Sequence, residues 1–197
     1  MNKNTKPYEF FNPNLLNSII EKKNYPAMIQ YAYDLEGLRN GLPYHRDLKL
    51  LEEMKDCQTI IINHILSLDD KILSDQLSLE MFDKTDLFPE LYESACAKLI
   101  SDKTPEETMA LYKKIKNQCF YRPSHTMLKH VSSNTKKADT CLFFIKDLEE
   151  SYKKYGIKEY NDHILDFYKR FRSVCSQEEY EQFIESGTKD DSDLQRQ

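Results

Sequence analysis

YHRDLKLLEEMKDCQTIIINHILSL, residues 44–68, is the longest periodic segment of the chain. Its apolar residues recur at spacings of three and four, the repeat that places side chains on one face of an α-helix. This apolar stripe consists of Leu51, Met54, Ile61, Ile65 and Leu68. The segment therefore predicts a long helix with one face in a core.

Start and stop signals for further helices recur on both sides of this segment. Thr104-Pro105-Glu106-Glu107 is the clearest start, with a capping threonine, a proline at the first helical position and a capping-box glutamate. Ser176-Gln177-Glu178-Glu179 is a second capping box, and Gly156 is a stop signal after a helix over 135–155. Further helices are predicted near residues 13–20, 26–40, 69–77, 86–101, 104–118, 124–133, 160–174 and 176–187.

The short connections favour antiparallel neighbours, so we expect an all-α fold, an irregular antiparallel helical bundle of about eight helices. Glycine supports this fold class, because the 197 residues hold only 4 glycines. Phosphate-binding loops and tight hairpins depend on glycine, so a nucleotide-binding domain or a meander of short strands is disfavoured. We predict a single all-helical domain over residues 1–187, in which 1–41 is a candidate N-terminal subregion, and a disordered acidic tail over 188–197.

The cysteines indicate a reducing compartment. Five are scattered through the chain without a C-x-x-C pair, which is typical of small core residues and not of a disulfide framework. No apolar run resembles a conventional signal peptide or a membrane-spanning segment. We therefore expect a soluble, cytoplasmic protein.

The charge pattern has one pronounced asymmetry. The chain has a formal net charge of -5, yet residues 109–138 contain no acidic side chain. Such a block is typical either of a surface that binds an anionic partner or of solvated lysines, some placed favourably at a helix C-terminus. The candidate partner-binding residues are Lys113, Lys114, Lys116, Arg122, His125, Lys129, His130, Lys136 and Lys137.

The most suitable partner for this segment is a protein with an acidic face. Anionic lipid headgroups are the alternative, and they would make the chain a peripheral membrane protein. Nucleic acid fits poorly, because the rest of the chain is acidic and would repel a long polyanion.

No catalytic residue, metal site or cofactor is predicted. The spacing of Cys119, His125 and His130 matches no compact zinc pattern. A cysteine-dependent enzyme remains a further alternative, with Cys119 in the basic segment as its best nucleophile. The leading hypothesis is a non-enzymatic interaction protein.

The end of the chain resembles a known class of signals. Glutamates from Glu178 to Glu185 precede a polar stretch, residues 186–197, that is rich in Ser and Asp and has an isolated Leu194. This pattern resembles the carboxy-terminal translocation signals of bacterial type IV secretion effectors. The resemblance implies a bacterial protein that is delivered into the cytosol of a eukaryotic host cell, so the acidic partner would be a host protein.

Overall fold

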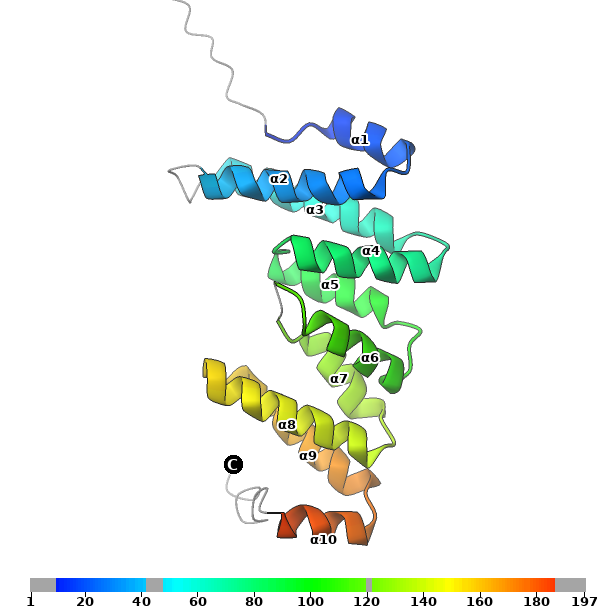
Figure 1. Ribbon diagram of the computed structural model, residues 1–197, viewed down its shortest axis with the longest axis vertical. Coiled ribbons are helices and arrows are strands. Elements are labelled where there is room, and N and C mark those ends of the chain that lie inside the picture. Colours follow the sequence, from blue (N-terminus) through cyan, green and yellow to red (C-terminus); the bar gives the residue numbers. More distant parts are fainter. Residues whose placement is uncertain (1–9, 42–47, 120–121, 187–197) are drawn as a thin grey trace, which may run out of the picture. The chain divides into compact units, whose positions relative to one another are not determined.

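The computed structural model of the protein describes residues 10–41, 48–119 and 122–186. These three ranges contain ten helices and no strand, which confirms the all-α prediction and exceeds the expected number of about eight helices (Figure 1). The helices are α1 (Pro13–Glu21), α2 (Tyr25–Gly41), α3 (Leu48–Leu66), α4 (Lys71–Lys84), α5 (Pro89–Leu99), α6 (Pro105–Ile115), α7 (His125–Asn134), α8 (Ala138–Tyr155), α9 (Glu159–Val174) and α10 (Gln177–Glu185).

Side-chain caps explain where two of these helices begin. At α10, the Ser176 hydroxyl accepts from the N–H of Glu179 at 3.2 Å, and the Glu179 carboxylate accepts from the N–H of Ser176 at 2.7 Å. Thr104 and Glu107 make the same reciprocal pair at α6, at 3.3 and 2.8 Å. These bonds satisfy N–H groups that have no partner inside the helix. Both predicted capping boxes are thus confirmed.

The chain divides into two compact units. Unit 1 comprises Met1–Ser101 and Lys113–Arg122, and unit 2 comprises Asp102–Tyr112 and Pro123–Gln197. The division falls within α6. One antiparallel bundle and a single domain over 1–187 stay predictions, and the tail over 188–197 lies outside the described residues.

In unit 1, α2 packs against α1, α3 and α4, and α3 also packs against α4 and α5. A buried polar cluster ties the α4–α5 connection to α2 and α3. The Gln58 side chain of α3, which is 1% exposed, donates to the Glu36 carboxylate and to the carbonyl oxygen of Asp86, both at 3.3 Å. The N–H of Asp86 donates to Glu36 at 3.0 Å, and the N–H of Phe88 donates to Gln58 at 3.3 Å. This connection is therefore fixed by side chains from two other helices.

Unit 2 is built on α8 and α9, which lie side by side, and α7 also packs on α9 (Figure 1). The rings of Phe144 on α8 and Phe167 on α9 stack with their centroids 4.7 Å apart. The hydroxyl of buried Tyr112 on α6 donates to the buried carboxylate of Asp147 on α8 at 2.8 Å. The core of this unit thus contains a stacked aromatic pair and a buried polar pair.

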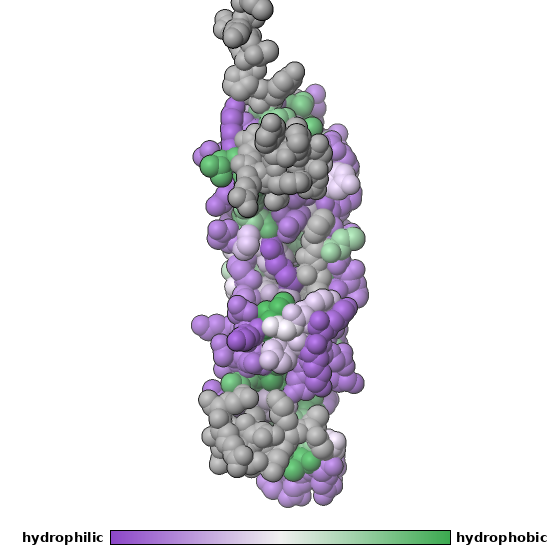
Figure 2. Space-filling view, turned by 90° about the vertical axis from the view of Figure 1, so that its left-hand side faces the viewer, coloured by the Kyte–Doolittle hydropathy of each residue, from purple (hydrophilic) through white to green (hydrophobic). Residues whose placement is uncertain are grey.

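The described surface is largely polar. Figure 2 shows mostly hydrophilic residues on the face that it draws, with apolar residues in small separate patches. None of the helices in the described part of the chain combines the length and apolar character needed to cross a bilayer.

Candidate anion-binding surface on helix α9

The predicted basic segment is divided between the two units. Lys113 and Lys114 lie in the last turn of α6, where cations complement the helix dipole, and Lys116 and Arg122 follow in unit 1. The other predicted site residues belong to unit 2: His125, Lys129, His130, Lys136 and Lys137. The nine residues are thus divided into a group of four in unit 1 and a group of five in unit 2.

Arg122 makes its contacts within unit 1. Its guanidinium donates to the carbonyl oxygen of Leu87, lies 3.8 Å from the Asp86 carboxylate and stands over the Tyr92 ring, 4.7 Å from the centroid. The Tyr92 hydroxyl donates back to the carbonyl oxygen of Arg122 at 2.9 Å. Arg122 therefore holds the α4–α5 connection in place, a structural role that the sequence does not reveal.

Both predicted histidines have partners in unit 2. His125 Nδ1 lies 2.7 Å from Nε2 of His163 on α9, so one ring nitrogen donates to the lone pair of the other. His130 Nε2 lies 3.0 Å from the carbonyl oxygen of Lys103 and donates to it. These contacts tie α7 to α9 and to the segment before α6.

The three predicted site lysines of unit 2 are exposed. Lys137 pairs with Glu106 at 3.5 Å, and both of these side chains are open to solvent. Lys129 on α7 and Lys136 after it are also exposed. Of these three, Lys129 lines a hollow together with residues of another helix.

This polar hollow lies between α7 and α9 and has a volume of about 320 Å³. Arg170 is held in place, because its Nε donates at 2.6 Å to the carbonyl oxygen of Thr135 at the C-terminal end of α7. Three cationic side chains therefore meet one carboxylate around a cavity that is otherwise lined with hydroxyls. The lining residues are Lys129, Ser132, Ser133, Asp166, Lys169, Arg170 and Ser173.

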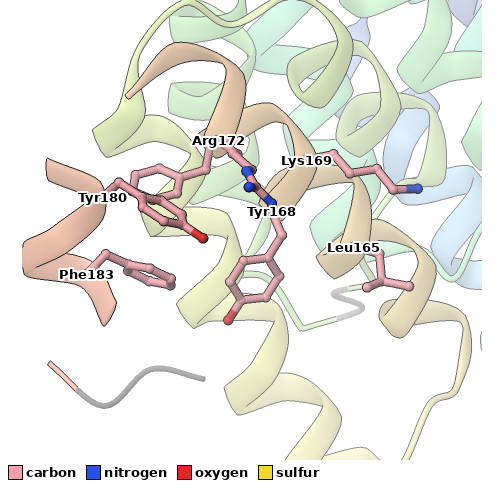
Figure 3. A pocket seen from close by; sticks show the side chains of 7 residues that line it. Leu165, Tyr168, Lys169, Arg172, Tyr180 and Phe183 are labelled. Atoms are coloured by element: carbon pink, nitrogen blue, oxygen red, sulfur yellow. The ribbon is translucent and has the colours of Figure 1, made fainter. Parts of the chain in front are cut away.

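A second, aromatic hollow of about 150 Å³ lies between α9 and α10 (Figure 3). Tyr180 and Phe183 come from α10, and the Arg172 guanidinium of α9 lies 5.7 Å from the centroid of the Tyr180 ring. The Tyr168 hydroxyl donates to Glu149 at 3.0 Å, and burial, with a smaller contribution from this carboxylate, raises the pKa of Tyr168. Lys169 lines both hollows.

Lys169, Arg170 and Arg172, here called the basic strip, therefore lie between a polar and an aromatic hollow. Sequence reasoning missed these residues, because it looked for a run without acidic residues, and Asp162 and Asp166 interrupt any such run in α9. The available signal was the density of cations in Lys169-Arg170-Phe171-Arg172, at the end of a helix.

Two of the buried cysteines are poor nucleophiles. Burial raises the pKa of Cys57 to about 12 and that of Cys141 to about 11, which disfavours the reactive thiolate. Cys119 is exposed, and its N–H donates to the Asp83 carboxylate at 2.9 Å. Within the described ranges, no group of three or more His, Cys, Asp or Glu side chains is arranged to hold a metal ion.

Comparison with known proteins identifies no relative. No protein-family model, curated protein or solved structure matches the chain at a significant level.

Proposed function

We propose that the protein is a non-enzymatic interaction protein that binds an acidic segment of a partner protein on the C-terminal half of α9. One observation carries the proposal: three cations, Lys129, Lys169 and Arg170, surround a polar hollow that adjoins an aromatic one. Lys129 belongs to the basic segment predicted from sequence, and the basic strip of α9 extends that surface.

The polar hollow suits carboxylates. Arg170 is already oriented by its bond to Thr135, so binding an anion costs little further side-chain entropy at this position. Lys129 and Lys169 are exposed and can reach an incoming anion from two helices. Asp166 disfavours a dense polyanion in the same hollow, which is a further reason to prefer a protein segment with spaced carboxylates.

The aromatic hollow suits one apolar side chain of the same segment. Sites for cofactors and drug-sized ligands measure about 300–1,000 Å³. At about 150 Å³ this cavity is smaller than that, but it can take a single anchoring side chain. Tyrosine and arginine, which line it together, are the residue types that most often dominate binding at protein interfaces.

The resemblance of the tail to translocation signals adds a setting to this proposal. If the chain is a bacterial effector, it acts in the host cytosol, and the acidic segment belongs to a host protein.

A cysteine-dependent enzyme is a weaker alternative, because the described histidines have partners other than Cys119. His125 pairs with His163, His130 pairs with the carbonyl oxygen of Lys103, and His64 stacks on Tyr25.

Binding of a labelled synthetic peptide tests the proposal. The peptide has glutamates around one phenylalanine, and a peptide with lysines in place of the glutamates serves as the negative probe. Lys129→Glu combined with Lys169→Glu should weaken binding at least about tenfold, because it reverses two charges at the hollow. Lys22→Glu combined with Lys71→Glu is the matched control, since it makes the same change in net charge on exposed lysines of unit 1.

Equal weakening in both double variants would show that only net charge matters and would overturn the proposal. Tyr180→Ala should weaken binding of the peptide that contains phenylalanine but not of one with alanine in its place. That second comparison isolates the aromatic hollow, and it does not depend on the charge of the protein.

A further inference from the structure

The turn between α8 and α9 exposes apolar and basic side chains together. Every residue of 153–158 is exposed, and the segment reads Lys-Lys-Tyr-Gly-Ile-Lys. Tyr155 is 56% exposed and Ile157 is 37% exposed, so two large apolar side chains that lie two positions apart are both open to water. Their neighbours Lys153, Lys154 and Lys158 make the segment cationic, and it contains no acidic residue. We call residues 153–158 the tip.

The backbone of the tip is well defined by hydrogen bonds. Gly156 ends α8 in the left-handed conformation, with φ of 67°, and its N–H donates to the carbonyl oxygen of Tyr152 at 2.8 Å. The carbonyl oxygens of Ile157 and Lys158 accept from the first turn of α9, at 3.2 and 3.0 Å. Tyr155 and Ile157 are therefore held at the end of the α8–α9 hairpin, where the core of unit 2 does not cover them.

Solvated lysines alone do not account for this arrangement. Lysines are common on surfaces. An isoleucine and a tyrosine exposed on either side of a left-handed glycine, however, leave apolar surface in water that the rest of the unit does not cover. Lys154 Nζ lies 4.9 Å from the centroid of the Tyr155 ring, so the cation and the apolar ring form one amphipathic surface. The α8–α9 turn lies on the left in Figure 1, and this side faces the viewer in Figure 2.

We propose that the tip docks on bilayers that contain anionic lipids, with Tyr155 and Ile157 entering the interface and Lys153, Lys154 and Lys158 contacting lipid phosphates. Tyrosine is favoured at the level of the headgroups, and lysine stems extend along apolar surface while their ammonium groups reach the phosphates. Lysines both precede and follow the apolar pair in the sequence. Their ammonium groups can therefore contact the headgroup phosphates while the two apolar side chains enter the interface.

A bilayer fits the tip better than a protein partner does. The tip is a single turn at the end of a hairpin and not a groove, so it offers a protein no concave surface. Glu150, Glu159 and Asp162 lie in the adjoining helices and reduce the local positive charge, which restricts binding to strongly anionic membranes and makes it weak and reversible.

This inference goes beyond the proposed function and does not rest on it. Ile157 and Arg170 are thirteen positions apart in the sequence, and thirteen positions of an α-helix span roughly 20 Å. A chain docked through the tip would therefore leave the polar hollow open to a protein partner.

Sedimentation with lipid vesicles tests the docking of the full chain. Vesicles of phosphatidylcholine with about one third phosphatidylserine should bind the protein, and vesicles of pure phosphatidylcholine should not. Tyr155→Ser combined with Ile157→Ser should lower the affinity at least about tenfold. Lys153→Gln, Lys154→Gln and Lys158→Gln should each lower it about fivefold. Lys129→Gln combined with Lys169→Gln is the control and should leave it unchanged.

Tryptophan fluorescence provides a direct measure of insertion, because the chain contains no tryptophan. The emission of Ile157→Trp should shift to the blue on adding anionic vesicles, whereas that of Ile72→Trp, at a position 73% exposed on α4, should not. Three results would overturn the proposal. They are no binding to anionic vesicles, unchanged binding after Tyr155 and Ile157 are replaced by serine, and loss of binding in the control variant with Lys129→Gln and Lys169→Gln. The circular dichroism of each variant checks that it is folded.

Discussion

The guanidinium of Arg122 and the ring of Tyr92 lie against each other at 4.7 Å, and the Tyr92 hydroxyl donates to the carbonyl oxygen of Arg122 at 2.9 Å. Burial of Tyr92, which is 3% exposed, raises the pKa of its hydroxyl, so this group stays a donor. The pair fixes the end of the basic segment of unit 1 to α5. A residue that the charge pattern assigns to a binding surface is thus part of the folded framework.

Arg122→Ala should lower the free energy of unfolding by about 2 kcal/mol, because it removes the cation–π contact and the bond to the Leu87 carbonyl oxygen. Urea denaturation followed by circular dichroism measures the change. Lys114→Ala is the control, since Lys114 is exposed in the last turn of α6 and should change stability by less than about 0.5 kcal/mol. Equal effects of the two substitutions would contradict the structural role of Arg122.

Tyr112→Phe should lower the free energy of unfolding by about 2 kcal/mol. The substitution removes the hydroxyl that donates to the buried Asp147 carboxylate at 2.8 Å. A double-mutant cycle with Asp147→Asn measures the coupling of the two side chains, which should be at least about 1 kcal/mol. Additive effects would show that the two groups contribute independently of each other.

The helices were largely predictable, because their signals are local. Thr104 and Ser176 each lie just before the helix that they were expected to start, and their side-chain bonds confirm this. The stripe of the long helix was less accurate: Met54, Ile61 and Ile65 are buried as predicted, whereas Leu51 and Leu68 are only half-buried. Leu50 and the polar Gln58 are also buried on this helix. Gln58 can be buried because its amide is hydrogen-bonded to Glu36, Asp86 and Phe88.

The candidate site was only partly predictable, because its residues meet in space and not in sequence. Lys129 and Arg170 line one hollow although they are 41 positions apart in the sequence. Periodicity shows which face of a helix is apolar, but it does not show which helix packs against that face. The same limit hid the contact of Arg122 with Tyr92.

Stability should depend on pH through the two capping boxes. Hydrogen bonds from the backbone and the side chain of Thr104 lower the pKa of Glu107, and those from Ser176 lower the pKa of Glu179. A lowered pKa means that the contribution to stability is present above the ordinary glutamate pKa of 4.5 and is lost as the pH falls through the lower value in the folded state.

The melting temperatures of the wild type and of Glu107→Gln combined with Glu179→Gln test this dependence. Their difference should be constant between about pH 6 and pH 8 and should shrink below the ordinary glutamate pKa. Glu185→Gln, at an exposed position at the end of α10, is the control whose difference from wild type should stay small. A difference that grows on acidification would have the wrong sign for carboxylates stabilised in the charged form.

Two turns of the chain should both be more stable with glycine than with another residue, because both are left-handed. Lys23, with φ of 51°, adopts the left-handed conformation after α1, and its N–H and that of Asn24 donate to the carbonyl oxygens of Ile20 and Ile19 at 2.8 and 3.1 Å. This is the helix ending at which glycine is favoured, because a side chain is strained there. Lys23→Gly should therefore raise the free energy of unfolding by about 0.5–1 kcal/mol.

Gly156, with φ of 67°, makes the same kind of ending after α8, so Gly156→Ala should lower stability by about 1 kcal/mol. A Cβ built at this position has no neighbour within 4 Å, so the cost comes from backbone strain and not from a clash. Gly37→Ala is the matched control: its Cβ also meets nothing within 4 Å, but it lies inside α2, where alanine is the better helix former and should stabilise. Opposite signs for the two glycines in urea denaturation would confirm the strain, and destabilisation by both would point to a common loss of backbone flexibility instead.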